Sequence, residues 1–424
     1  MKSLSALAQN YIDRFETALE TLPGQSSRSI SELRKAGLEK FAVQDFPNKR
    51  VEEWRFTNLS SMTKDVANED GAGVSALTPS LFETDYEIVF IDGLFSEEQS
   101  KLDGLPNGLS ISSFVDALEN GAVFSLNSEE ERSLIALNTA FMQDGFCIHV
   151  GEKTKIDGIV GIKFKNSGAI KNGAHLRNRI TLDTGAALTL IELHEGDGSY
   201  FSNPVSHISI GEGARLDHYK LQNESVSAYH LALTDVEVQK QGIYKNFSFS
   251  VGGKISRNEL KTVILGSDAE SHLDGAYLMR GDQHCDTTTL TEHKVPKNIS
   301  NQTYKGVLDD KAHGVFQGKI HIAPDAQQVA GDQLSKALLL SDYAAVDCKP
   351  ELEIYADDVK CSHGATSGEL DDDALFYLQA RGIPELEARK ILIEAFLGDV
   401  LLSIDNEKVR EYFSTRSAHW LKQS

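Results

Sequence analysis

A turn followed by a short strand recurs through the middle of this chain of 424 residues. The nine residues LDTGAALTL, which begin at Leu182, superpose on IGEGARLDH, which begins at Ile210, at an offset of 28 residues. Looser copies begin at Leu265, Leu308, Ile322 and Tyr355. In each copy Gly or Asp suits a tight turn, and a β-prone run follows it. A repeat of this size predicts stacked strands in a parallel β-helix, with a large β-sandwich as the alternative.

Helical patterns flank the repeat on both sides, so we expect three regions. Residues 1–150 combine helices with a mixed α/β pattern, and residues 151–366 contain the repeat with no helical periodicity. Residues 367–424 become helical again. The spacing of apolar residues changes from a helical period to a strand-like pattern at the first boundary, and it returns to a helical period at the second.

Several elements are expected in the first region. Apolar residues within residues 4–22 recur at helical spacing and predict a helix. Ser29 and Glu32 have the spacing of a capping box, which predicts the start of a second helix. The run EIVFIDGLF at residues 87–95 predicts a strand, and residues 128–145 predict a helix with acids in its first turn.

The last region is expected to hold three helices. Asp371 or Asp372 caps the first of them, and Gly382 ends it. The second, at residues 385–403, carries apolar residues most of the way round, which indicates burial on more than one side. Asp405 is the expected cap of the third helix.

Charge and hydropathy limit the classes of partner and location. The formal net charge is −21, whereas nucleic acids and anionic membranes bind clustered Lys and Arg, so we expect neither as a partner. Polar residues interrupt the apolar pattern of the N-terminus throughout, and no long apolar run follows, so we expect a cytoplasmic protein with no signal peptide or membrane span. The four cysteines form no CxxC pair and are expected to be free thiols: Cys147, Cys285, Cys348 and Cys361.

One pair of residues has the spacing of metal ligands. Cys361 and His363 lie two residues apart, and on a strand such residues point to the same face. A thiolate and an imidazole could then bind one iron or zinc ion, or the imidazole could lower the pKa of the thiol. Two ligands do not complete a tetrahedral site, so a second chain or a cofactor would have to supply the others. Spacing alone favours the structural alternative, a half-buried cysteine beside a hydrogen-bonded histidine.

We expect structural roles for the other histidines and cysteines considered as ligands. Cys147 and His149 repeat the Cys-x-His spacing within an apolar strand, which shows how unspecific the pattern is. Cys348 is expected to be a small core residue. The remaining candidates are weak as metal ligands and are more often hydrogen-bonding or core residues: His284, Cys285, His293, His313 and His321.

Motifs of common enzymes are missing from the sequence, so we expect no catalytic activity. There is no phosphate-binding GxxxxGK[ST], no GxGxxG after a strand, no GxSxG and no HExxH. The acidic runs at 129–131 and 371–373 lie at predicted helix starts, where the helix dipole favours them. A β-helical carbohydrate-active enzyme is the rival class, and it would need a pair of carboxylates in a cleft.

Three longer segments resemble a known family. The segment KPELEIYADDVKCSHGATSGELDDDALFYLQARGI, at residues 349–383, is closely similar to the C-terminal signature of the SufB/SufD family on its SufD side. The segments ISNQTYKGVLDDKAHGVFQGKI, at residues 299–320, and EEWRFTNL, at residues 52–59, are similar to other parts of the same family. Members of this family are scaffold subunits of the Suf system for iron–sulfur cluster assembly. The resemblance spans most of the chain, is strong over its last third and diffuse from about residue 60 to 290.

The resemblance implies a fold, partners and a site. It implies a core that is a right-handed parallel β-helix, flanked by an N-terminal domain and a C-terminal helical segment. A SufD-type subunit would pair with SufB through the β-helices and bind the ATPase SufC through its C-terminal helices, although it could form a homodimer in isolation. Cys361 and His363 would lie at the SufB interface as ligands for iron or a transient iron–sulfur cluster, and the isolated chain would hold no stable cofactor.

Two function hypotheses follow from these patterns and this resemblance. In the first, the chain is a non-catalytic scaffold whose Cys361 and His363 contribute to iron acquisition or cluster assembly. In the second, it is a purely structural adaptor in which both residues are inert.

Overall fold

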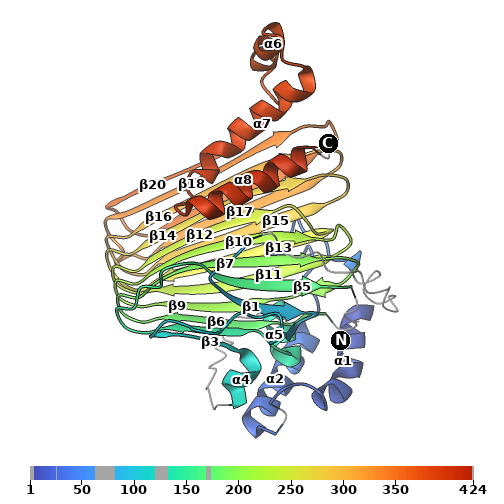
Figure 1. Ribbon diagram of the computed structural model, residues 1–424, viewed down its shortest axis with the longest axis vertical. Coiled ribbons are helices and arrows are strands. Elements are labelled where there is room, and N and C mark those ends of the chain that lie inside the picture. Colours follow the sequence, from blue (N-terminus) through green and yellow to red (C-terminus); the bar gives the residue numbers. More distant parts are fainter. Residues whose placement is uncertain (1–3, 25, 63–81, 120–131, 169–172, 423–424) are drawn as a thin grey trace.

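The computed structural model of the protein describes residues 4–24, 26–62, 82–119, 132–168 and 173–422. Figure 1 shows a tall stack of strands, with the N-terminal helices beside its lower part and the C-terminal helices beside and beyond its upper part. None of the described helices has the length and apolar character needed to cross a lipid bilayer.

Two sheets enclose the interior of the stack, and from β9 (Val205–Ile210) onward consecutive strands alternate between them. Sheet A contains, in spatial order, β2 (Leu94–Phe95), β1 (Tyr86–Ile91), β5 (Val160–Asn166), β7 (Ala187–Gly196), β10 (Arg215–Glu224), β12 (Ile243–Ser250), β14 (Glu270–Met279), β16 (Ile299–Leu308), β18 (Val329–Leu339) and β20 (Val359–Gly368). Sheet B contains β19 (Ala345–Ile354), β17 (His313–Ile322), β15 (His284–His293), β13 (Ile255–Ile264), β11 (Tyr229–Val238), β9 (Val205–Ile210), β6 (Arg177–Leu182), β4 (Phe146–Val150) and β3 (Leu109–Ser113), with the short β8 (Phe201–Ser202) beside β11.

The strand register confirms the parallel β-helix predicted from the repeat. Ala187 on β7 lies opposite Arg215 on β10 in a parallel pair, which is the 28-residue offset of the two best copies. One copy of the repeat precedes a strand of the other sheet. The turn that begins at Leu308 leads into β17 of sheet B, whereas the other copies lead into strands of sheet A. Similar turn residues therefore serve both edges of the stack.

The turns stack on one another and explain why the repeat fades along the sequence. Gly185 and Gly213 have positive φ angles of 70° and 65°, which favour glycine. The amide of Gly185 donates to the carbonyl of Glu212 at 2.8 Å, and the amide of Gly213 donates to that of Lys240 at 2.9 Å. In the next turn Gln241 adopts φ 55° without being glycine. The backbone repeat thus persists where the sequence repeat weakens.

The N-terminal helices pack against the outer face of sheet B. They are α1 (Ala6–Leu19), α2 (Arg28–Gln44), the one-turn η1 (Glu52–Trp54) and α5 (Ser133–Phe141), while α4 (Phe114–Glu119) follows β3. Tyr11 of α1 packs edge-on against Phe141 of α5 at 5.1 Å, and both belong to one buried cluster with Phe201 and Leu233 of sheet B. Burial of such large side chains contributes about 1.5–3 kcal/mol each to stability.

Two local predictions in this region are wrong. The expected capping box is absent, because α2 begins at Arg28 after Ser27, and Glu32 pairs with Arg28 at 2.7 Å instead. The run expected as one strand at 87–95 is a hairpin of β1 and β2. Its two turn residues, Asp and Gly at 92 and 93, have positive φ angles that suit a two-residue reversal. The acids at 129–131 lie outside the described residues.

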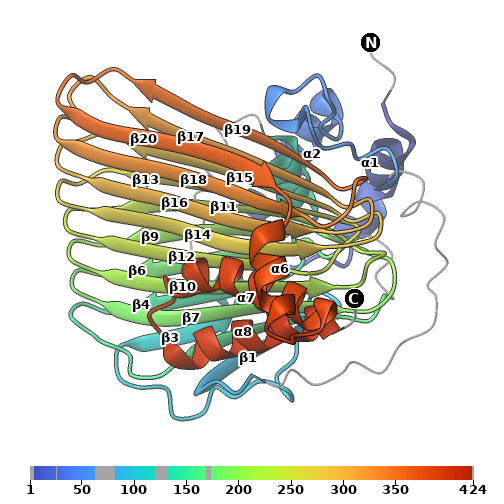
Figure 2. The ribbon, with the colours of Figure 1, turned by 90° about the horizontal axis from the view of Figure 1, so that it is seen from above.

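The C-terminal helices lie against sheet A and extend past the end of the stack (Figures 1 and 2). They are α6 (Asp372–Ala380), α7 (Glu385–Leu401) and α8 (Glu407–Lys422). The ring of Phe413 on α8 stacks on Phe249 of sheet A at 5.4 Å. Asp371 caps α6, as predicted, by accepting from the amide of Ala374 at 3.0 Å.

The predicted cap of the last helix is wrong by one residue. Asn406 accepts from the amide of Val409 at 3.2 Å at the start of α8. Asp405 instead pairs with Arg215 and Lys245 on sheet A, each at 2.7 Å. The carboxylate thus anchors the α7–α8 connection to the solenoid rather than capping a helix.

Candidate functional site

The last strands of both sheets form an open end of the solenoid. Within the described chain, β20 pairs with β18 alone and β19 pairs with β17 alone, so no further rung covers them. Figure 2 looks onto this end, with β19 and β20 as the uppermost strands, α6 projecting above them and the N-terminal and C-terminal helices on opposite sides of the stack. Inner faces that are buried in every earlier rung are therefore accessible here.

Cys361 and His363 both lie on the inner face of β20. The thiol of Cys361 packs against the buried interior cluster that contains Ile320 and Val329. Because side chains alternate along a strand, His363 shares this inner face, and it is exposed because no rung covers it. The structure therefore brings the predicted pair together on one accessible surface.

The strand below accommodates these two side chains. Gly331 lies opposite Cys361, and a Cβ atom built on Gly331 would lie 3.5 Å from the Cys361 sulfur and 3.3 Å from Ile320. The contact with the sulfur would be an ordinary one, and only the contact with Ile320 would be tight. Gln333 lies opposite His363 and is buried, and its Oε1 atom accepts no hydrogen bond from the described residues. A polar acceptor thus lies directly beneath the imidazole.

The Cys361 thiol is held in its neutral form. Partial burial raises the pKa of the Cys361 thiol above its ordinary value, although a hydrogen bond from the Gly331 backbone opposes the shift. The thiolate is the form that binds metals, so metal binding here would release a proton. A thiol of this kind would bind a metal weakly by itself and more strongly where further ligands are supplied with the metal.

A further thiol, that of Cys348, lies on the inner face at the same end of the solenoid, which no local sequence pattern indicated. Cys348 is on β19 opposite the buried Phe316, which places it on the inner face of sheet B. Its sulfur lies 3.6 Å from the hydroxyl of Ser335 on β18. The register between β17 and β19 was the signal needed to find it. Even so, the described residues contain no cluster of three or more His, Cys, Asp or Glu side chains arranged to hold a metal ion.

The second Cys-x-His pair faces outward. On β4, Phe146, Ile148 and Val150 are buried in the interior, so Cys147 and His149 point away from it. His149 Nε2 lies 2.9 Å from the carboxylate of Asp183 on the exposed surface. Burial raises the pKa of the Cys147 thiol to about 12.

The other histidines of the sequence analysis lie on or in sheet B. His284 and His313 meet through their Nδ1 atoms at 3.2 Å on the outer face. His293 Nε2 and the hydroxyl of Ser300 are 2.9 Å apart in the interior, and His321 packs against the ring of Tyr355 at 5.5 Å. Cys285 is a buried core residue, and burial raises the pKa of its thiol.

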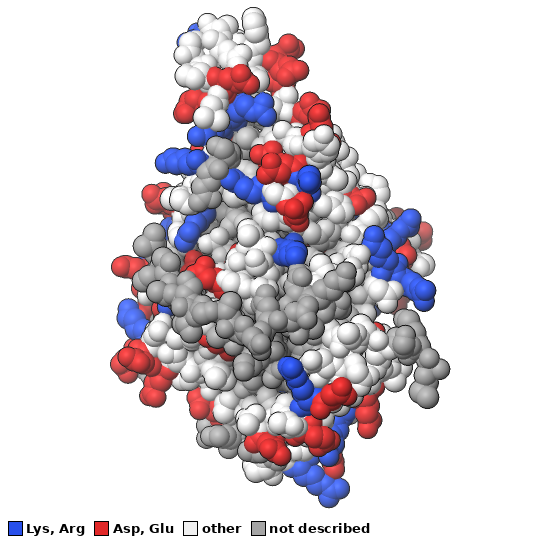
Figure 3. All heavy atoms as spheres, turned by 90° about the vertical axis from the view of Figure 1, so that its right-hand side faces the viewer, with Lys and Arg blue, Asp and Glu red and all other residues white. Residues whose placement is uncertain are grey.

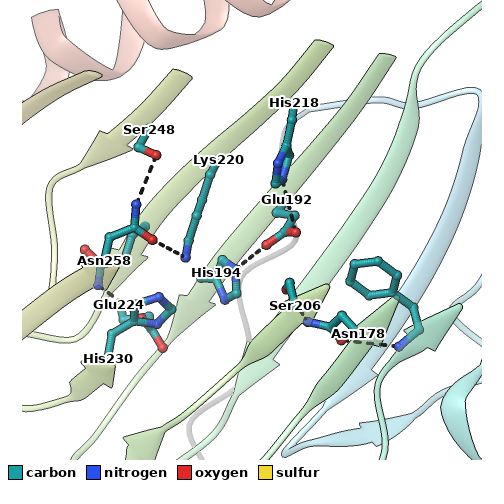
Figure 4. A network of polar contacts seen from close by, with 12 residues as sticks. Asn178, Glu192, His194, Ser206, His218, Lys220, Glu224, His230, Ser248 and Asn258 are labelled. Atoms are coloured by element: carbon teal, nitrogen blue, oxygen red, sulfur yellow. Dashed lines mark hydrogen bonds and ion pairs between the residues drawn. The ribbon is translucent and has the colours of Figure 1, made fainter. Parts of the chain in front are cut away.

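A buried polar network in the solenoid interior was not predicted. The two carboxylate oxygens of Glu192 each lie 3.1 Å from an imidazole nitrogen, one of His194 and one of His218 (Figure 4). Burial favours the neutral acid, but hydrogen bonds from these two histidines hold the pKa of Glu192 well below its ordinary value. Burial lowers the pKa of His194 to about 4, so that imidazole is neutral.

The network continues onto neighbouring strands. His230 Nδ1 lies 2.7 Å from the carboxylate of Glu224, and Lys220 Nζ lies 3.3 Å from Asn258 Oδ1 (Figure 4). Slippage of any of these strands by one residue would leave a buried charge without its partner, at a cost of several kcal/mol. We therefore interpret this network as a device that fixes register rather than as a reactive site.

Comparisons with known proteins match nearly the whole chain. The family model described as the SUF system FeS cluster assembly, SufBD core domain matches residues 164–396. The SufBD protein N-terminal region matches residues 5–70 and 74–162. Together these matches cover the N-terminal helices, the solenoid and much of α7.

Named relatives agree with these matches. The chain is 29% identical over 419 residues to an iron–sulfur cluster assembly SufBD family protein of Synechocystis, which covers 93% of this chain and 92% of the relative. It is 28% identical over 418 residues to the chloroplastic protein ABCI7 of Arabidopsis thaliana, covering 94% and 87%. It is 34% identical over 252 residues to the iron–sulfur cluster assembly protein SufD of Escherichia coli, covering 59% and 60%. The chain therefore belongs to the SufBD family of the SUF system for iron–sulfur cluster assembly, as a SufD-like member.

Proposed function

We propose that the protein is a non-catalytic SufD-type scaffold that pairs with SufB through the open end of its solenoid. Cys361 and His363 would then serve at that interface as ligands for iron or a nascent cluster. The observation that carries this proposal is the uncovered inner face of β20, where a thiol and an imidazole stand side by side on an otherwise closed core. Unpaired strand edges and exposed inner faces are typical of a surface that another chain covers.

The incomplete ligand set fits a site shared between chains. Iron bound by sulfur and nitrogen ligands needs more donors than two, so SufB would supply the others. Docking of SufB would also exclude water from the Cys361 thiol, and the bound metal would stabilise its thiolate. The metal would thus bind where the two subunits meet and leave when they separate.

The C-terminal helices are the proposed docking region for the ATPase SufC. The turn and helices that extend past β20 expose large apolar side chains, with Phe376 71%, Tyr377 57% and Leu386 58% exposed. Figure 3 shows this projecting part at the top, where uncharged atoms dominate the tip and acidic groups lie at its side. Exposed apolar surface of this kind marks a protein interface. We propose that residues 367–424 dock SufC, with the core of the solenoid at 151–366 and the N-terminal region at 1–150, although β1 to β4 of that region already extend the two sheets.

The scaffold would work in the cytoplasm, with ATP hydrolysis supplied by SufC rather than by this chain. A reducing compartment suits its four free cysteines. Closure and opening of SufC would then move the projecting helices and, through sheet A, the metal-binding end.

Anaerobic co-expression with SufB and SufC tests the proposal, with co-purification scored before iron and sulfide content. We expect a stable complex, and we expect Cys361→Ala to leave assembly intact while removing most of the iron. Cys147→Ala is the matched control, because it removes a thiol from the other Cys-x-His pair. Failure to co-purify would sink the scaffold proposal. Full iron and sulfide content in Cys361→Ala would instead support the purely structural adaptor.

A further inference from the structure

Residues 52–57 form a strap across the outer face of sheet B. The segment includes η1 and lies far in sequence from every strand that it contacts. The strap contacts four neighbouring strands. Trp54 packs on Arg257 of β13 at 4.0 Å, and Thr57 forms hydrogen bonds with His284 and Asp286 of β15. The Glu53 carbonyl accepts a hydrogen bond from Gln317 of β17 at 2.9 Å, and Glu52 pairs with Lys349 of β19 at 2.7 Å. The strap therefore joins the N-terminal region to the last strand of sheet B.

A continuous hydrogen-bond chain runs from the strap into the sheet. The hydroxyl of Thr57 contacts the carboxylate of Asp286 and also lies 2.8 Å from His284 Nε2. His284 Nδ1 lies 3.2 Å from His313 Nδ1. His313 Nε2 lies 2.8 Å from the carboxylate of Asp347 on β19. Five side chains are thus linked through four consecutive contacts.

The protonation state of these five side chains determines whether all four hydrogen bonds can form together. Each of the four contacts needs one hydrogen, and the two ionised carboxylates supply none. The Thr57 hydroxyl supplies one hydrogen, and each neutral imidazole supplies one, which gives three. A fourth is present only when one of the two histidines, His284 or His313, is an imidazolium. The closed strap therefore binds one proton more than the neutral side chains provide.

The surroundings place this proton on His313. Burial lowers the pKa of His284 to about 4, and the nearby Arg257 acts in the same direction, while Asp286 and Asp347 oppose it. His284 is therefore neutral. His313 stands between a neutral imidazole nitrogen that accepts and the Asp347 carboxylate, so an imidazolium there satisfies both contacts.

We propose that residues 52–57 are a proton-linked strap, closed on sheet B while the His284–His313 pair carries one extra proton and loosened when that proton leaves. When the strap lifts, the two contacts of Thr57 disappear. The two remaining contacts need two hydrogens, which two neutral imidazoles supply. The open state thus needs no extra proton. By linkage, acidity favours the closed strap and rising pH favours the open one.

Opening of the strap would affect the metal-binding end of the solenoid. Lys349, which the strap holds through Glu52, directly follows Cys348 on β19. Loss of this contact frees the outer face of the last strand in sheet B. The strap is a feature of the isolated protein and does not depend on SufB or SufC as partners.

Tryptophan quenching in the full-length chain tests the strap. The chain has two tryptophans, so Trp420→Phe leaves Trp54 as the only reporter. We expect acrylamide quenching of Trp54 to be weak near pH 5.5 and to increase several-fold by about pH 8.5, with unchanged far-ultraviolet circular dichroism. Thr57→Val and His313→Gln, each in this background, should abolish the pH response, because the first removes the hydroxyl and the second removes one of the two paired imidazoles.

His149→Gln is the matched control, because His149 also faces a carboxylate at 2.9 Å but lies on β4, away from the strap. It should retain the full pH response. A pH-independent signal in the Trp420→Phe background would overturn the proposal. So would a response that persists in either Thr57→Val or His313→Gln, or one that vanishes in His149→Gln.

Discussion

The two Cys-x-His pairs of this chain have the same spacing and opposite environments. Cys147 and His149 lie on β4, whose inner positions are filled by Phe146 and its apolar neighbours, so the pair faces outward, with Cys147 half-buried and His149 exposed. Cys361 and His363 lie on β20, where the pair itself occupies inner positions. The spacing of two ligand-type residues on a strand therefore does not show which face of the sheet they occupy. That face follows from the strand register, and a pair on the inner face is accessible to a metal only where no further rung covers it.

Neighbouring strands explain the contrast. β4 lies between β3 and β6, and its Cα atoms pair on both sides. β20 has a partner on one side within the described chain. The same two residue types are therefore a surface pair on one strand and an uncovered core pair on the other. Four predictions test this contrast, from the largest expected effect to the smallest.

The largest effect is expected from the histidines. His363→Ala should remove most of the iron from the anaerobically isolated complex with SufB and SufC, because it deletes one of the two ligands that this chain offers. His149→Ala should leave the iron content unchanged. Iron analysis of both purified complexes measures the difference, and equal losses in the two variants would contradict the contrast.

A substitution in a covered rung should destabilise the protein more than a substitution at the open end. Leu216 is buried in a rung that has neighbours on both sides, so Leu216→Ala should lower the free energy of unfolding by about 2–5 kcal/mol. Cys361→Ala, at the open end, should cost about 1 kcal/mol or less. Urea denaturation of the isolated chain compares the two. A cost for Cys361→Ala that equals that of Leu216→Ala would mean that the end is covered.

Thiol reactivity should separate the cysteines and depend on pH. Burial raises the pKa of Cys361, so its thiolate is scarce at neutral pH, and its alkylation should speed up by about tenfold per pH unit as pH rises toward that pKa. Mass spectrometry can follow each cysteine separately. SufB should protect Cys361 and Cys348 from alkylation but leave Cys147 unaffected. Unchanged labelling of Cys361 in the complex would place SufB elsewhere.

The smallest effect is expected beneath the thiol. Gly331→Ala places a Cβ atom 3.3 Å from Ile320, whose side chain must give slightly, and in ordinary contact with the Cys361 sulfur at 3.5 Å, so iron affinity should fall by no more than a few-fold. The free energy of unfolding should change by less than about 1 kcal/mol. Gly364→Ala is the control, because its Cβ would meet only Leu334 at 3.4 Å among the described residues. Equal changes in affinity in both variants would deny a special role to the space at Gly331.

The solenoid could be predicted from sequence because its turns follow simple chemistry. The copies at Leu182 and Ile210 share a glycine at the positive-φ position, and their offset equals the register of β7 and β10. The copy at Leu308 was misleading because turns at both edges use similar residues. Asp405 was expected to be a cap, yet its carboxylate reaches two cations on sheet A that are distant in sequence.

Only part of the candidate site could be predicted, because some of its residues are brought together from distant parts of the sequence. Cys361 and His363 are close in sequence, so alternation alone places them on one face. Cys348 required the register between two strands, and the pairing of Glu192 with His218 required a view of the interior. Polar residues at alternate strand positions are expected to face solvent, so no local pattern indicated that these would be buried.

Anaerobic titration of Fe(II) tests the central claim most directly. The isolated chain and its complex with SufB would be compared, each as wild type and as Cys361→Ala. An interface site predicts tight binding by the wild-type complex, weak binding by the isolated chain, and loss of the tight site in the Cys361→Ala complex. Equally tight binding by the isolated chain, or by the Cys361→Ala complex, would contradict it.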